Sequence, residues 1–242
     1  MLYKLDDNLI FPDPNKAPAD GLLAYGGDLT TDRLLFAYRS GIFPWYNEEP
    51  ILWWSPNPRF VVFPDKVYVS RSMRKILEKN VFTITVDTAF EQVINNCADI
   101  PRAGQPGTWI TEEMIEAYCR LFDEGYAHSF EAWKNGELVG GLYGLSMGSI
   151  FFGESMFTFA SNASKAAFLS MASFVKKMGF SLIDSQVHTP HVETLGGESI
   201  SRRKYLEILK NGLQQNDVTG SWSELYSSVT SSGTTLATED PR

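Results

Sequence analysis

The sequence predicts a protein of the mixed α+β class, and three observations lead to that prediction. The segments HSFEAW, ELVGGLYGLSMG and SIFFGESMF form a run of strand candidates, and the turns between them contain Gly136 and Gly148. The segments FVVF and FTITV (82–86) are rich in β-branched and aromatic residues, which suit a pleated sheet. Helical segments interrupt these strands. Antiparallel strands in sequence, with helices before and after them, are typical of an α+β fold.

Helix signals place the remaining elements. A basic helix is expected at 71–79, and two more at about 88–97 and 111–124, the second with acids in its first turn. Ser161 or Asn162 is expected to cap the helix ASKAAFLSMASFVKKM, which Gly179 ends. The strand FSLIDSQV follows, and a helix near 200–211 closes the fold.

The first sixty residues differ from the rest. They are expected to be loops around one helix that contains LLFAYR, because four prolines between residues 44 and 58 exclude a long regular element after it. We therefore expect a small amino-terminal domain (1–60) and a larger domain (61–225). A polar tail of low complexity (226–242) is expected to be flexible.

Composition excludes several classes of protein. Hydrophobic residues make up 43% and charged residues 21% of the 242, close to a globular average. There is no apolar run of eighteen residues, and acids occupy the amino terminus where a signal peptide needs basic residues, so we expect a cytoplasmic protein without a membrane partner. Two cysteines without a CxxC pattern, and three histidines, are too few for a zinc site, and we expect no metal and no cofactor.

The net charge and the local charge of the sequence give opposite indications about a nucleic-acid partner. The net charge of −8 argues against a nucleic-acid partner, because such proteins usually carry a basic surface. The segment RSMRKILEK nevertheless contains four basic residues and one acid: Arg71, Arg74, Lys75 and Lys79 against Glu78. A second basic cluster lies at residues 202–204. Each cluster is either a solvated helix face or a local site for phosphates.

Three polar residues in apolar strands are candidates for chemistry. Glu154 follows an apolar approach in SIFFGESMF, and is either a strand-edge residue in water or an acid placed in a cleft to bind a cation or take a proton. Asp184 and Gln186 alternate in SLIDSQV and are expected on one face of a strand. On that face Asp184 would accept a hydrogen bond from the NH₂ of the Gln186 side chain. The side-chain carbonyl oxygen of Gln186 would then point outward. The alternative is a polar outer face.

Aromatic residues are a further group of candidates. Trp45, Trp53, Trp54 and Trp109 either fill a domain interface or provide surfaces on which nucleobases stack. Tyr38 and Tyr118 bring phenols that could hold a ribose or an ester. The three histidines show no pattern of a nucleophile and its base, so we expect no covalent intermediate.

The order of helices and strands resembles that of the N-acetyltransferase-like fold. An acyl-CoA enzyme of that fold needs a glycine-containing cradle for pyrophosphate at the start of the helix after the central strands. Here the junction reads FTFASNASKAAF, which contains no glycine to allow a close approach. Coenzyme A is therefore disfavoured.

Eight sequence blocks, in this order and nearly this spacing, make the comparison specific: GLLAYGGDL, FPWY, ILWWSPNPR, GTWIT, ELVGGLYG, FFGESMF, NASKAA and LIDSQV. From about residue 10 to about residue 210 the chain resembles the bacterial leucyl/phenylalanyl-tRNA–protein transferase family. It departs from the family pattern in the loop HTPHVETLGGESIS. The resemblance implies a small amino-terminal domain on an acetyltransferase-like (GNAT-type) domain. It also implies transfer of Leu, Phe or, less readily, Met from aminoacyl-tRNA to proteins that begin with Arg or Lys, which marks them for N-end-route degradation.

The same resemblance implies roles for individual residues. Asp184 and Gln186 match the catalytic pair, and Glu154 matches the acid near the acceptor. Four positions match those around the terminal adenosine: Trp45, Trp109, Tyr38 and Tyr118. Five match the apolar pocket for the transferred side chain: Leu142, Phe151, Met156, Phe168 and Ile183. The basic helix 71–79 matches the contact with the tRNA acceptor stem.

Two other functions stay open at this point. One is a CoA-dependent N-acyltransferase of the same fold. The other is a non-catalytic module that binds peptides or RNA through its tryptophans.

Overall fold

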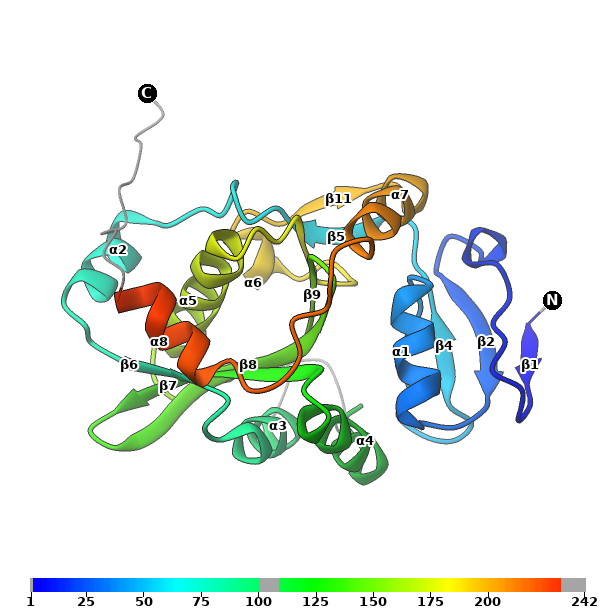
Figure 1. Ribbon diagram of the computed structural model, residues 1–242, viewed down its shortest axis with the longest axis horizontal. Helices are drawn as coiled ribbons and strands as arrows, with labels where there is room; N and C mark the ends of the chain where they lie inside the picture. The colour runs from blue at the N-terminus through cyan, green and yellow to red at the C-terminus, as the bar shows by residue number, and fades with distance from the viewer. Residues whose placement is uncertain (1, 101–108, 232–242) are drawn as a thin grey trace.

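The computed structural model describes residues 2–100 and 109–231, and two β-sheets organise them (Figure 1). The smaller sheet has the order β1-β2-β4-β3, with β1 (Tyr3–Leu5), β2 (Leu22–Gly26), β3 (Phe43–Pro44) and β4 (Leu52–Trp54). The larger sheet has the order β11-β5-β10-β9-β8-β7-β6, with β5 (Arg59–Val62), β6 (Thr83–Val86), β7 (Ala127–Lys134), β8 (Glu137–Met147), β9 (Ile150–Thr158), β10 (Leu182–Asp184) and β11 (Glu198–Ile200). The predicted α+β class is confirmed.

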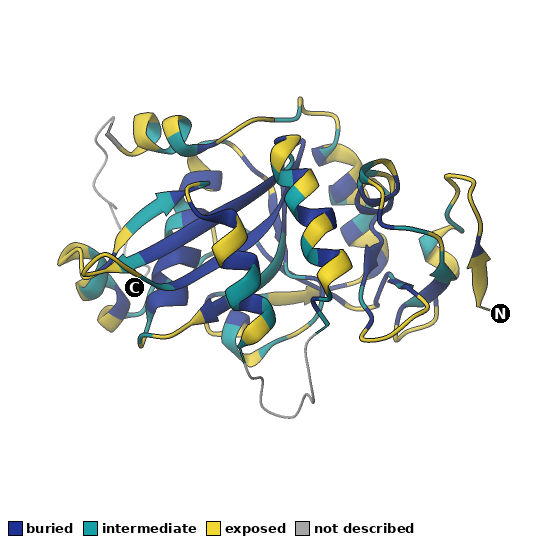
Figure 2. Ribbon diagram, turned by 90° about the horizontal axis from the view of Figure 1, so that it is seen from below, coloured by how far each residue is buried: buried dark blue, intermediate teal, exposed yellow. Residues whose placement is uncertain are grey.

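Helices cover both faces of the larger sheet. The helices of the described residues, those beside either sheet included, are α1 (Thr31–Arg39), α2 (Arg71–Glu78), α3 (Phe90–Asp99), α4 (Glu112–Asp123), α5 (Ala163–Lys177), α6 (Pro190–Glu193), α7 (Arg202–Gly212) and α8 (Ser223–Ser231), with a 3-10 turn, η1 (Pro14–Lys16). Of these, α1 packs beside β3 of the smaller sheet. Helix α5 packs on β7, β8 and β9, whereas α3 and α4 pack on the opposite face (Figure 1). Strands β7 and β8 are therefore buried along most of their length, whereas β9 is half-buried at residues 153–156 (Figure 2).

The centre of the larger sheet is the predicted run of three antiparallel strands. Strands β7, β8 and β9 follow one another through tight turns, and Leu142 lies opposite both Phe130 and Met156. Strand β10 then pairs with β9 in parallel, with Asp184 opposite Phe152. A parallel pair needs a crossover, which α5 provides.

Three segments differ from the prediction. The first sixty residues contain the smaller sheet as well as one long helix, because their strands of two to five residues are too short to show alternation. Strand β10 ends at Asp184, short of the predicted segment. The predicted tail begins inside α8, which packs on α5 and β6, so residues 226–231 are helical. Residues 232–242 lie outside the described part of the chain.

Polar contacts connect the amino-terminal part of the chain with helices that lie beside the larger sheet. The guanidinium of Arg202 is 6% exposed and donates to the backbone carbonyls of Pro14, Ala17 and Pro18 at 2.6–2.8 Å. The sequence suggested that residues 202–204 form an accessible basic cluster. Arg202 is buried and does not belong to such a cluster. At the surface, the hydroxyl of Thr31 also donates to Glu124 at 2.8 Å. Within residues 2–100 and 109–231, none of the helices has the length and apolar character needed to cross a membrane.

Candidate active site

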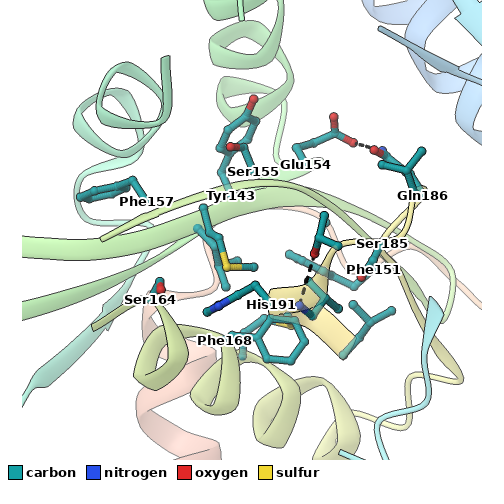
Figure 3. A pocket seen from close by; sticks show the side chains of 18 of the residues that line it. Tyr143, Phe151, Glu154, Ser155, Phe157, Ser164, Phe168, Ser185, Gln186 and His191 are labelled. Carbon is teal, nitrogen blue, oxygen red and sulfur yellow. Dashed lines mark hydrogen bonds between the residues drawn. The ribbon is translucent and has the colours of Figure 1, made fainter. Parts of the chain in front are cut away.

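A cavity of about 420 Å³ lies between strands β8 and β9, helix α5 and the segment 183–192 (Figure 3). All five side chains predicted to form an apolar pocket line it: Leu142, Phe151, Met156, Phe168 and Ile183. Trp45 and Trp109 also line it, so the two tryptophans predicted near the adenosine share the cavity with that pocket. Among described residues, no group of His, Cys, Asp and Glu is arranged to hold a metal ion.

A β-bulge turns Glu154 toward this cavity. On β8, Tyr143 pairs with Ser155 and the next residue, Gly144, pairs with Gly153, so Glu154 is the extra residue on β9. A bulge re-aims a side chain and is frequent next to active sites. Glu154 accordingly lines the cavity, which favours the cleft interpretation of this residue over a strand-edge position in water.

Three neutral donors surround the Glu154 carboxylate. Oε1 accepts from the Tyr38 hydroxyl and from Gln186 Nε2, each at 2.7 Å, and Oε2 accepts from the Tyr118 hydroxyl at 3.1 Å. Burial raises the pKa of Glu154 to about 7, and these three hydrogen bonds oppose that rise. The group can therefore hold or release a proton near neutral pH, which suits a general base.

Gln186 reaches Glu154 through an unusual backbone conformation. Its φ is 62°, in the left-handed region that a non-glycine residue adopts at a cost of about 1–3 kcal/mol. Because its Nε2 is committed to Glu154, its carbonyl oxygen is left as an acceptor for another group. Figure 3 shows the pair side by side at one side of the cavity.

Asp184 has different contacts from those the sequence suggested. It is fully buried, outside the cavity lining, and its carboxylate binds the guanidinium of Arg59 at 2.8 and 2.6 Å. The same carboxylate accepts from the Tyr205 hydroxyl at 2.7 Å and from the backbone N–H of Gln186 at 2.9 Å.

The prediction that Asp184 orients the Gln186 side-chain amide is therefore wrong. The strand ends at Asp184 and Gln186 has a positive φ, so the two residues do not share a strand face. Asp184 holds the Gln186 backbone, and Glu154 holds its side chain. The sequence did not identify Arg59 and Tyr205 as partners of Asp184. A buried acid needs a cation, which indicates that an arginine or lysine lies nearby but does not indicate which one.

The two tyrosines also lie elsewhere than expected. Tyr38 and Tyr118 are fully buried, contact each other through their hydroxyls, and do not line the cavity. Burial, followed by the charge of Glu154, raises the pKa of both phenols well above the usual value, so both stay protonated and donate. Both hydroxyls donate to Glu154, and their place near the adenosine stays a prediction.

The basic helix α2 lies away from the cavity and packs on α5 (Figure 1). Ser70 caps it by accepting from the N–H of Met73 at 3.2 Å, and Met73 is its buried anchor. Arg71, Lys75 and Lys79 are exposed and Arg74 is half-buried. The four predicted basic residues therefore form part of an accessible surface.

An apolar cavity that ends at a carboxylate of raised pKa suits a substrate with an apolar side chain and a reacting basic group. Comparisons with known proteins give the family. The model of the leucyl/phenylalanyl-tRNA protein transferase family matches residues 61–210, and the model of that transferase's N-terminal domain matches residues 27–57.

Relatives with the name leucyl/phenylalanyl-tRNA–protein transferase cover nearly the whole chain. The protein of Myxococcus xanthus is 51% identical, over 92% of this chain and 97% of its own. The protein of Syntrophus aciditrophicus is 54% identical, over 89% of this chain and 90% of its own. The chain therefore belongs to the leucyl/phenylalanyl-tRNA–protein transferase family.

Solved structures with a weaker likeness include two in which the match is distributed over most of this chain. The L-PGS protein of Bacillus licheniformis is 11% identical with a TM-score of 0.40, over 86% of this chain and 65% of its own. A GCN5-related N-acetyltransferase from Kribbella flavida is 10% identical with a TM-score of 0.36, over 69% of this chain and 60% of its own. Likeness at this level carries no argument about function.

Proposed function

We propose that this chain, as a member of an aminoacyl-tRNA–protein transferase family, moves Leu, Phe or Met from aminoacyl-tRNA to the α-amine of proteins that begin with Arg or Lys. The observation that carries the proposal is the shape of the site: an apolar pocket on one side of a cavity and the Glu154–Gln186 pair on another (Figure 3). The pocket suits the transferred side chain, and the pair suits the attacking amine.

The reaction needs an acyl acceptor and a place for one proton. The acceptor nitrogen attacks the ester carbonyl carbon, a C–N bond forms, and the C–O bond to the ribose breaks. The nitrogen loses a proton and the ribose oxygen gains one, so no oxidant or further reactant is required. Because the ester is already activated, positioning of the two reactants provides much of the rate.

Glu154 is the proposed base for that proton. A carboxylate offers about four acceptor positions, and the described neighbours occupy three of them. The fourth can accept from the acceptor amine, whose pKa of about 7.7–8.0 lies close to that of Glu154. Gln186 then contributes its free carbonyl oxygen as a second acceptor for the same amine. In this proposal Asp184 positions Gln186 and touches no substrate.

The remaining parts follow from exposure and position. Trp45 and Trp109 line the cavity and are proposed to stack on the terminal adenosine of the tRNA. The exposed basic residues of α2 are proposed to contact phosphates of the acceptor stem. Degradation of the modified proteins by the N-end route and a cytoplasmic location complete the proposal.

The division into domains is part of the same proposal. A small amino-terminal domain (1–60) and a catalytic domain (61–225) agree with the two separate sheets and with the two separate family matches. Tyr38 comes from the first domain and Glu154 from the second, so the site needs both.

The experiment is transfer of a labelled amino acid to matched peptides. The purified chain is incubated with Leu-tRNA and a peptide that begins with Arg, and the product is weighed by mass spectrometry. We expect a gain of one leucyl group at the α-amine, and none on a peptide that differs only by an initial Glu. Acylation with acetyl-CoA in place of Leu-tRNA, or no acylation with either, would contradict the proposal.

A further inference from the structure

The imidazole of His191 is one of the polar groups that line the cavity and that the proposed reaction does not use. This residue lies in α6 and lines the cavity on the side where Phe168 lies, away from the Glu154–Gln186 pair (Figure 3). Its Nε2 atom is buried and has no hydrogen-bond partner. A buried polar atom without a partner costs about 1–3 kcal/mol and calls for an explanation.

The backbone around His191 is held firmly. Thr189 caps α6 by accepting from the N–H of Val192 at 3.2 Å, and Pro190 occupies the first position of the helix. The hydroxyl of Thr194 donates to the His191 carbonyl at 2.7 Å. These contacts hold the main chain that carries the imidazole at the cavity.

The surroundings of the imidazole keep it neutral. Burial lowers the pKa of His191, and the positive charge of Lys165 lowers it further. At neutral pH the ring therefore carries a single N–H and adds no charge to an apolar pocket. Phe168, Met156 and Met171 line the same cavity, so the partner that the His191 Nε2 atom lacks can come from a ligand.

We propose that His191 determines donor specificity by placing its Nε2–H against the far end of the transferred side chain, where it contacts the thioether of a methionyl donor. The inference rests on the proposed function, because it assumes that the ester is bound near Glu154 and that the side chain extends away from it. The thioether sulfur is a weak acceptor and a polarizable partner for rings. Leu and Phe donors fill the same space without that contact.

The experiment compares methionyl-tRNA with norleucyl-tRNA, made on the same tRNA. The two side chains have the same length and differ only in a sulfur in place of a methylene. For the wild-type chain and an Arg-initiated peptide, we expect kcat/KM to favour the methionyl donor by roughly two- to tenfold. In His191→Leu the ratio should fall to about one, whereas His191→Gln, which keeps an N–H donor, should retain part of the preference.

Leucyl-tRNA and His188→Leu are the matched controls. Leucyl transfer by His191→Leu shows that the variant folds and keeps a working pocket, and His188 is exposed and outside the cavity lining. A methionyl preference that survives in His191→Leu, a wild-type ratio of one, or an equal loss for all three donors would overturn the inference. Absence of transfer from any donor by the wild-type chain would instead refute the proposed function.

Discussion

Asp184 and Glu154 are carboxylates on neighbouring strands, and their surroundings differ in one decisive respect. Asp184 is fully buried, and an arginine, a phenol and a backbone N–H fill all of its acceptor positions. Glu154 has three neutral donors, and among described residues it forms no ion pair. Asp184 also contributes to the raised pKa of Glu154 through its negative charge.

The comparison shows how two acids on neighbouring strands of one sheet can differ in their capacity to contact a substrate. Asp184, whose acceptor positions are filled by Arg59, Tyr205 and the Gln186 N–H, has no position left for a substrate. An acid held only by neutral donors keeps a pKa near 7 and an open acceptor position. The first therefore holds backbone in place, and the second is available to react.

The strongest test of the comparison is Glu154→Gln. Removal of the base should lower the rate of the chemical step by about 10²–10⁴-fold, with tRNA affinity almost unchanged. Single-turnover transfer from Leu-tRNA at a saturating peptide concentration measures this. Glu131→Gln is the matched control, because Glu131 is another buried acid with a raised pKa but lies outside the cavity. A similar loss of rate in both variants would contradict the role of Glu154.

Asp184→Ala should act mainly on stability. It leaves the Arg59 guanidinium buried and unpaired, which costs about 3–5 kcal/mol in the free energy of unfolding. The double variant Arg59→Met/Asp184→Leu should lose less than Asp184→Ala alone, because it buries no lone charge. Urea unfolding at pH 7 measures both. Additive losses, or a cost below 1 kcal/mol for Asp184→Ala, would show that the pair is not held as described.

The pH dependence of stability should distinguish the two acids further. The pKa of Glu154 is about 7 in the folded chain and near 4.5 when unfolded, so the folded state binds more protons between these values. The contribution of this group to stability is thus present below about pH 4.5 and is lost as pH rises through 7. Glu154→Gln should therefore gain stability relative to wild type between pH 5 and pH 8, by roughly 3 kcal/mol at most. A constant difference across this range would refute the raised pKa.

The smallest expected effect concerns α2, which lies outside the cavity lining. Arg74→Ala/Lys75→Ala on α2 should weaken binding of different tRNAs alike, by roughly tenfold, and reduce the salt slope by about 2. Arg203→Ala/Lys204→Ala removes the same charge from α7 and is the control. Filter binding at several salt concentrations measures both. An equal effect of the two double variants would indicate a general charge effect and not a contact made by α2.

Much of the fold could be predicted because its signals are local. The three central strands and α5 were predicted nearly at their observed bounds, since alternation, glycine turns and a terminal Gly179 mark them in the sequence. Helix α2 was predicted at 71–79 and is observed at Arg71–Glu78. The strands of the smaller sheet could not be predicted in this way, because each is held by pairing with distant residues and not by its own pattern.

The candidate site was predictable in its residue types but not in its contacts. The apolar lining followed from the family resemblance, and all five side chains share the cavity. The bulge at Glu154 and the positive φ of Gln186 depend on the register of two strand pairs, which no single segment specifies. Arg59 could not be predicted for a similar reason, because it lies 125 positions from its partner Asp184 in the sequence.

The hydrogen bond from Tyr38 to Glu154 has a consequence for the time at which the site forms. The two residues lie 116 positions apart, and Gln186 is later still in the chain. During synthesis the amino-terminal part emerges first and has no acid to support. A ribosome-bound chain that has not yet exposed residue 186 can therefore fold its smaller sheet without completing the Glu154–Gln186 pair. The proposed site is complete only when Tyr38, Glu154 and Gln186 have met.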